Sequence, residues 1–101
     1  MIILKTKVFD EWFRKLRNGI AKAKINARLR RIELNNEIIG DYKIIGEKVI
    51  ELRFNTGPGY RVYITKEGDN LVVLLIGGDK SSQDTDIDTA KRLAKEWRSK
   101  R

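Results

Sequence analysis

Apolar side chains recur at intervals of three and four residues in the first third of the chain, which is the spacing of a helix. One such stripe runs from Phe9 to Leu16 and a second from Ala21 to Ile32. The Asn18–Gly19 pair between them is a helix-breaking signal. We therefore predict a helical hairpin, preceded by a short edge strand in "MIILK", with the second helix ending near "NNEIIG".

The pattern changes to that of strands in the second half. The segments "DYKIIG", "KVIELRF", "YRVYIT" and "LVVLLI" follow one another across short turns, as in an antiparallel meander. Because "LVVLLI" is apolar on both faces, we expect it to be the central, covered strand. The tail "DTDIDTAKRLAKEWRSKR" is a predicted helix, with acidic residues at its start and basic residues towards its end. We predict a single α+β domain over residues 1–101, with the helical hairpin and a C-terminal helix packed on a mainly antiparallel four- to five-stranded sheet.

The "KVIELRF" and "YRVYIT" strands place four polar side chains on one face. Leu52, Phe54 and Val62 must point to the core, and a three-residue "GPG" loop then sets Arg53 opposite Tyr63 and Glu51 opposite Thr65. The face away from the core carries the candidate catalytic residues Glu51, Arg53, Arg61 and Tyr63. The alternative is a solvated sheet face with a cross-strand Glu–Arg pair.

The charge favours a polyanionic partner. The chain has 22 Lys and Arg against 14 Asp and Glu, a net charge of +8, and most of the excess lies in the N-terminal third. Such a basic face attracts polyanions, RNA or DNA above all, and the alternative is a solvated, solubilising surface. The candidate RNA-binding residues are Lys22, Lys24, Arg28, Arg31 and Lys48.

The residue types present limit the reactions that the chain could catalyse. Histidine is absent, so proton transfer would have to use Glu, Asp, Lys, Tyr or Arg. The aspartates at 84, 86 and 88 resemble the start of a calcium loop, but Thr89 and Lys95 stand at positions that need Gly and Glu. The "GGDKSS" segment lacks the spacing of a Walker loop, and "GPG" lacks a third glycine. We expect no metal, cofactor or small-molecule ligand, no membrane span, and a cytoplasmic location, which the absence of cysteine favours.

The segments "ELRFNTGPGYRVYI", "LLIGGDKSSQ" and "DIDTAKRLAKEW" together resemble the RelE/ParE superfamily of toxin–antitoxin toxins, and its HigB-like, addiction module killer protein branch in particular. The resemblance covers nearly the whole chain. It implies a RelE-like α+β fold and an endoribonuclease that cuts mRNA, on or off the ribosome. It also implies a cognate helix-turn-helix antitoxin that neutralises the toxin.

The resemblance also assigns positions. The phosphate-contacting basic residue of the "GYR" strand corresponds to Arg61, and the arginine before the hairpin loop to Arg53. RelE has lysines just before that arginine, where this chain has Val49 and Glu51. RelE completes its site with an arginine and a tyrosine late in the chain, where this chain offers Asp79 and Lys80.

These observations lead to a metal-independent mRNA endoribonuclease as the expected function. We expect Glu51 to accept the proton of the RNA 2′-hydroxyl, with Lys80, Tyr63 or a ribosomal group as alternatives. Arg53, Arg61 and Lys80 are expected to stabilise the phosphate, with contact to the leaving group as an alternative for Lys80. Tyr63 is expected to orient the phosphate or to protonate the leaving oxygen. In "GGDKSSQ" we expect the two glycines to let the backbone approach RNA closely. We expect Ser81 or Ser82 to cap the following helix. The competing interpretations are a ParE-like toxin that poisons DNA gyrase and a non-catalytic nucleic-acid-binding domain.

Overall fold

The computed structural model describes residues 1–100, so the last residue of the predicted tail helix lies outside the described part. The elements follow one another as β1 (Ile2–Lys5), α1 (Lys7–Lys15), α2 (Gly19–Asn35), β2 (Tyr42–Gly46), β3 (Val49–Phe54), β4 (Tyr60–Glu67), β5 (Leu71–Asp79), a single 3₁₀ turn η1 (Lys80–Ser82) and α3 (Gln83–Ser99). The predicted α+β class and the order of its elements are confirmed.

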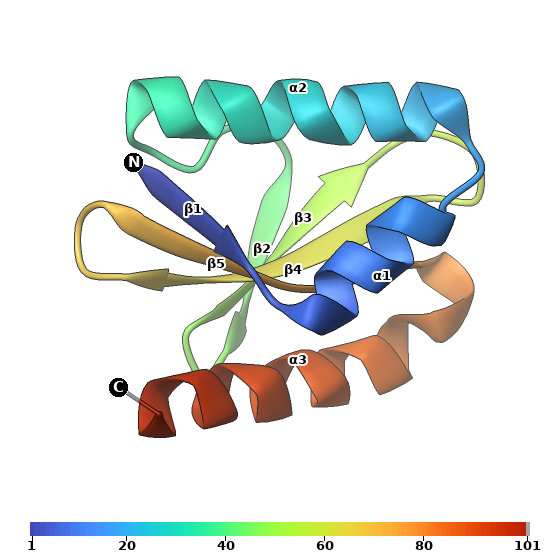
Figure 1. Cartoon of the computed structure of the whole chain (residues 1–101). Coiled ribbons are helices and arrows are strands. Elements are labelled where there is room, and N and C mark those ends of the chain that lie inside the picture. Colours follow the sequence, from blue (N-terminus) through green and yellow to red (C-terminus); the bar gives the residue numbers. More distant parts are fainter. Residues whose placement is uncertain (101) are drawn as a thin grey trace.

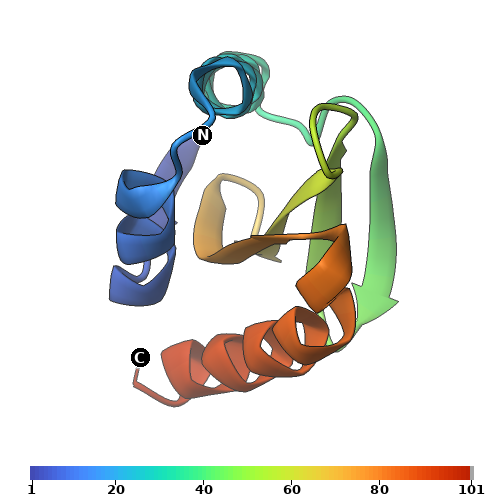
Figure 2. The same cartoon turned by 90° about the vertical axis from the view of Figure 1, so that its right-hand side faces the viewer.

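The five strands form one sheet in the order β1-β5-β4-β3-β2. The pairs from β2 to β5 are antiparallel, and β1 joins the edge of the sheet parallel to β5. Figure 1 shows α2 above the sheet and α3 below it, and Figure 2 shows α1 beside the β1–β5 edge. Among residues 1–100 no helix is both long enough and apolar enough to cross a bilayer.

The predicted N-terminal helices begin where the sequence provides a capping side chain. The Thr6 side chain accepts a hydrogen bond from the Phe9 amide at the start of α1, and Asn18 accepts one from the Ala21 amide at the start of α2. Asn36 adopts a left-handed conformation and ends α2, close to the predicted end. The apolar stripes of both helices pack into the same core, together with Phe54.

Both faces of the sheet are buried, and each face has its own core. The α1 and α2 side contains Leu52, Val62 and Leu74, whereas the α3 side contains Val73, Leu75, Tyr63 and the small helix residues Ala90 and Ala94. The "LVVLLI" strand is therefore covered on both faces, as predicted. It is an interior strand of the sheet, because β1 pairs with its outer edge and β4 with its other edge, although β4 is the middle strand of the five.

The hairpin register differs by two residues from the prediction. The loop between β3 and β4 contains five residues rather than three, so Arg53 lies opposite Arg61 and Glu51 opposite Tyr63. Because a two-residue shift preserves the alternation of faces, the four polar side chains still share one face. That face is covered by α3, and Glu51 and Tyr63 are fully buried, so it is not a solvated surface.

The β3 core position gives a direct test of the register. Phe54 is 6% exposed, and we expect Phe54→Ala to lower the free energy of unfolding by about 3–5 kcal/mol. Ile44, which is 69% exposed on β2, is the control, and Ile44→Ala should change it by less than about 0.5 kcal/mol. Urea denaturation measures both values, and similar small losses would show that Phe54 faces solvent.

Candidate functional site

A polar pocket of about 300 Å³ opens where the β3–β4 loop meets the start of η1. Arg53 and Arg61 enter it from neighbouring strands, and Lys80 enters from η1. We call it the cationic pocket, and its remaining lining residues are Asp41, Phe54, Asn55 and Gly59. Three of the predicted catalytic side chains therefore meet in one hollow, although Lys80 is about 20 residues further along the chain than Arg61.

The carboxylate of Glu51 lies beneath the pocket and contacts both guanidinium groups. Arg53 Nε donates a hydrogen bond of 2.9 Å to Glu51 Oε1, and Gln83 Nε2 donates one of 2.8 Å to Oε2. Arg61 Nε is 3.8 Å from the same Oε2. Arg61 also donates from Nη1 to the carbonyl of Gly59, which ties its side chain to the loop. The buried carboxylate of Glu51 and the carbonyl of Gly59 thus hold the two arginines in place.

The electrostatic surroundings keep Glu51 ionised. Burial by itself would raise the pKa of Glu51, but hydrogen bonds from Gln83 and Arg53 outweigh burial and lower the pKa below its ordinary value. The hydrogen bond to Glu51 in turn raises the pKa of Arg53. A buried carboxylate with a lowered pKa is a weak proton acceptor, but it is a strong anchor for a guanidinium.

Tyr63 is fully buried next to Glu51. Burial, and then the charge of Glu51, raise the pKa of the Tyr63 phenol. Its hydroxyl has no hydrogen-bond partner of normal geometry, although it is close enough to the carboxylate to affect the pKa of Glu51. The hydroxyl does not line the cationic pocket.

The "GGDKSSQ" turn positions Lys80 by local capping. Asp79 accepts hydrogen bonds from the amide and hydroxyl of Ser81, and these bonds lower the pKa of Asp79. Ser82 occupies the N-cap position of α3, but its hydroxyl donates to Asp86 rather than accepting from a helix amide. Lys80 directly follows β5, and this turn places its exposed side chain at the mouth of the pocket.

The two glycines of this turn make room for protein rather than for RNA. A Cβ atom added at Gly77 would collide with the Trp12 ring of α1, and one added at Gly78 would collide with Asp86 of α3. Both glycines are buried. The expectation that they admit RNA to the backbone is wrong, because a helix side chain already occupies each face at this point.

The predicted RNA-binding residues occupy different environments. Arg31 and Lys48 are exposed, whereas Lys24 donates to the Thr56 hydroxyl of the β3–β4 loop at 2.8 Å. Lys22 donates to the carbonyl of Arg14 and lies over the Phe13 ring. Only Lys24 reaches the loop that borders the cationic pocket.

Arg28 is buried, and its guanidinium is used within the fold. Its nitrogens donate to the carbonyls of Ile39, Arg53 and Asp41, each at 2.6 Å. Burial lowers the pKa of Arg28, and the planar group lies over the Phe54 ring. This arginine connects α2 to the two chain segments that form one wall of the pocket.

Sequence reasoning missed three polar residues of the site. Asp41 and Asn55 line the pocket, and Gln83 holds Glu51 from α3. Asn55 and Gln83 lie within the quoted segments "ELRFNTGPGYRVYI" and "GGDKSSQ", but no role is predicted for them there, and Asp41 precedes its strand by one residue. The signal that could have found Asp41 is the antiparallel pairing of β2 with β3, which brings the start of β2 to the end of β3.

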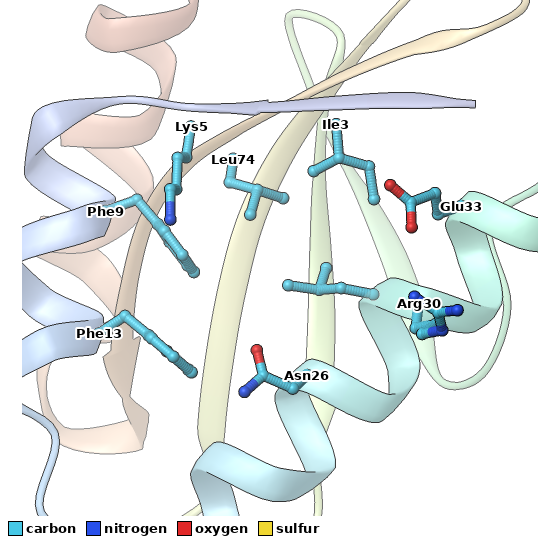
Figure 3. Close-up of a pocket in the computed structure, with 9 residues that line it drawn as sticks. Ile3, Lys5, Phe9, Phe13, Asn26, Arg30, Glu33 and Leu74 are labelled. Carbon is cyan, nitrogen blue, oxygen red and sulfur yellow. The ribbon is translucent and has the colours of Figure 1, made fainter.

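A separate hollow of about 290 Å³ lies between β1, α1 and α2. Figure 3 shows Phe9, Phe13 and Leu74 around it, with Arg30 and Glu33 on the α2 side. Its polar lining residues are Lys5, Asn26, Arg30 and Glu33. Within residues 1–100 no three His, Cys, Asp or Glu side chains are grouped so that they could hold a metal ion.

The fold is that of the RelE toxins. The structure of a double arginine-to-alanine mutant of E. coli toxin RelE in the free state superposes with a TM-score of 0.68 at 16% identity, over 90% of this chain and 95% of that one. The toxin in the intact E. coli RelBE toxin–antitoxin complex gives a TM-score of 0.62 at 13% identity, over 77% and 94% of the two chains.

Residues 11–97 match the profile of the phage-derived protein Gp49-like family (DUF891), and the chain belongs to this family. An uncharacterized protein of Haemophilus influenzae (strain Rd) is 51% identical over 94 residues, which is 93% of each chain. The solved RelE structures establish the kind of fold, and this relative extends the sequence similarity over almost all of the chain.

The lowered pKa of Glu51 predicts how stability depends on pH. Because the folded-state pKa lies below the unfolded value of about 4.3, the ionised carboxylate stabilises the fold above that pH. This contribution is lost as the pH falls through the folded-state pKa. We expect Glu51→Gln to cost about 1.5–3 kcal/mol at pH 7, and we expect that difference from the parent to shrink between about pH 5 and pH 2.

Denaturant unfolding across this pH range measures the difference. Asp86, whose pKa is raised by burial, contributes a pH dependence of opposite sign, but it is present in both proteins and cancels in the comparison. Glu37→Gln removes an exposed carboxylate and should follow the parent at every pH. A constant gap between the parent and Glu51→Gln would mean that the Glu51 carboxylate is not held ionised by the fold.

Proposed function

We propose that this protein is the toxin of a type II toxin–antitoxin module and a metal-independent endoribonuclease that cuts mRNA. The observation that carries the proposal is the convergence of Arg53, Arg61 and Lys80 in one solvent-open pocket of a RelE-like fold. Three cations around a hollow of this size suit a phosphodiester, whose charge increases during cleavage.

The proposed reaction is an internal transfer. The RNA 2′-oxygen attacks the adjacent phosphorus, the bond from phosphorus to the 5′-oxygen breaks, and a 2′,3′-cyclic phosphate and a 5′-hydroxyl are formed. Arg53 and Arg61 bind the non-bridging oxygens, where negative charge accumulates. Lys80, which is exposed at the mouth, supplies a proton to the leaving 5′-oxygen.

The proton of the 2′-hydroxyl goes to an acceptor in the pocket. Glu51 is fully buried and is engaged by Arg53 and Gln83, which supports a positioning role for it rather than that of a base. Asp41 is the exposed carboxylate that lines the pocket, and we assign the general base to it. Tyr63 supports Glu51 from the buried side and does not contact RNA.

The partners follow from the same proposal. The RelE fold is found with an antitoxin in the E. coli RelBE complex, and we propose a cognate helix-turn-helix antitoxin for this chain. The motifs around "GPGYRVY" and "GGDKSSQ" favour the HigB-like branch. The exposed cations of α2, such as Arg31, and Lys24 beside the loop are proposed to contact mRNA or the ribosome in the cytoplasm.

The first test concerns Arg61. We expect Arg61→Ala to reduce mRNA cleavage by about 100-fold or more and to relieve growth arrest after induction, because the main phosphate contact is lost. Message-end mapping and growth curves measure the effect, and circular dichroism verifies folding. Arg92→Ala, which removes an exposed α3 arginine, is the control and should remain toxic.

Two outcomes would contradict this assignment. Full toxicity of a folded Arg61→Ala protein would remove Arg61 from the site. Growth arrest by the parent with intact messages and with DNA breaks that depend on gyrase would favour the ParE-like alternative.

The second test separates the two carboxylates. We expect Asp41→Asn to slow single-turnover cleavage by about 100-fold with RNA binding retained, because it removes the proton acceptor. Glu51→Gln should instead weaken RNA binding and lower stability, since it releases the guanidinium of Arg53. The reverse pattern, with slow cleavage and normal binding only in Glu51→Gln, would return the role of base to Glu51.

A further inference from the structure

A second basic hollow, of about 330 Å³, lies where the turn between β2 and β3 meets the C-terminal half of α3. Figure 1 shows this turn pointing towards that part of the helix. Its lining residues are Glu47, Lys48, Lys91, Lys95 and Arg98. Four of these five side chains are cationic, so the ligand that suits the hollow is an anion.

The α3 residues of the hollow share one side of the helix. Lys91, Lys95 and Arg98 are spaced by four and three residues, which aligns them along α3. Arg98 is anchored, because it donates to Glu67 at 3.0 Å and to the Thr65 hydroxyl at 3.0 Å. This anchored guanidinium lines the hollow.

The β2–β3 turn presents the remaining lysine in a fixed position. Lys48 has a φ of 65°, a left-handed conformation that is unusual for a lysine. The Thr65 hydroxyl donates to the Lys48 carbonyl at 2.8 Å, and Arg98 donates to the Glu47 carbonyl at 3.2 Å. These bonds hold the turn against α3.

The lysines of the hollow are not neutralised by the protein. Within residues 1–100, Lys48, Lys91 and Lys95 form no ion pair. Glu47 is the carboxylate that lines the hollow, so the balance there remains positive. The charges are therefore available to an external anion.

An exposed lysine lies between this hollow and the cationic pocket. Lys43 pairs with Glu51 across β2 and β3, so both side chains point to the same face of the sheet. That is the α3 face, because Glu51 accepts a hydrogen bond from Gln83. Lys43 thus lies beside α3, about midway along β3.

From these positions we propose that a single strand of RNA runs from the cationic pocket past Lys43 to a phosphate-binding site formed by Lys48, Lys91 and Lys95. The proposal rests on the proposed ribonuclease function and names the path of its substrate. We call the row of Lys43, Lys48, Lys91 and Lys95 the lysine track. It binds backbone phosphates without reading bases, since ammonium groups act as point charges.

The dimensions agree with a strand of a few nucleotides. The pocket and the hollow lie at opposite ends of β3, whose six residues extend about 17 Å at roughly 3.3 Å per residue. At the duplex spacing of about 3.4 Å per phosphate about five phosphates cover this length, and a strand drawn out to about 6 Å per phosphate covers it with about three. A dinucleotide in the pocket, which has a single phosphodiester, is therefore too short to reach the lysines of the hollow.

The test compares RNA lengths in matched variants. Fluorescein-labelled 2′-O-methyl oligouridylates of about two and about eight nucleotides serve as probes, because they lack the 2′-hydroxyl and are not cut. The track variant is Lys91→Ala with Lys95→Ala. The control is Arg92→Ala with Lys100→Ala, which removes the same charge from α3 and its C-cap, away from the hollow.

Fluorescence anisotropy over a range of salt concentrations gives the affinities. We expect the parent and the control to bind the longer probe at least tenfold more tightly than the shorter one. The track variant should lose most of this gain while binding the shorter probe as the parent does. Its salt slope for the longer probe should fall by about 1.4, at roughly 0.7 for each lost phosphate contact.

The unfavourable outcomes are distinguishable. If the track variant binds both probes like the control, the lysine track is not the RNA path, and an acidic protein segment becomes the better occupant of the hollow. If the track variant binds both probes more weakly by the same factor, the two lysines act only through the overall positive field of the protein. The proposed path of the RNA is then also wrong. If the parent binds neither probe, the proposed ribonuclease function fails together with the track.

Discussion

The candidate site depends on one buried carboxylate. Glu51 accepts hydrogen bonds from Arg53 and Gln83 and lies 3.8 Å from Arg61, so it joins two strands to the first turn of α3. Without this anion, two guanidinium groups on facing strands would repel each other beneath a helix. With it, both can present their remaining nitrogens to an open pocket.

A second constraint comes from Arg28, whose guanidinium donates to three backbone carbonyls. Its donors bind Ile39, Asp41 and Arg53, and thereby fix the segment before β2 against the end of β3. Gly40 has a φ of 92°, and a Cβ atom at this position would come within 2.7 Å of Arg28 Nε. The arginine that charge alone would assign to RNA binding is therefore part of the wall that holds Asp41 at the pocket.

The proposed function distributes the basic residues over distinct tasks. Arg53, Arg61 and Lys80 surround the reacting phosphate, and the lysine track carries the strand along α3. Arg28 and Arg98 are bound to groups of the protein and shape the two hollows. Some of the basic residues thus stabilise the fold, and others are free to bind RNA. Hydrogen bonds to neighbouring groups of the protein distinguish the first kind from the second.

The sequence by itself determined the helices, the strands, the antiparallel hairpin and the face shared by Glu51, Arg53, Arg61 and Tyr63. These features follow from apolar periodicity and capping residues, which act over a few neighbours. Only the tertiary structure decided the two-residue register shift, which depends on the conformation of the β3–β4 loop. It also decided that Glu51 is buried, because α3 covers that face of the sheet. The same holds for Asp41 and Gln83, which reach the site through strand pairing and helix docking between segments distant in the chain.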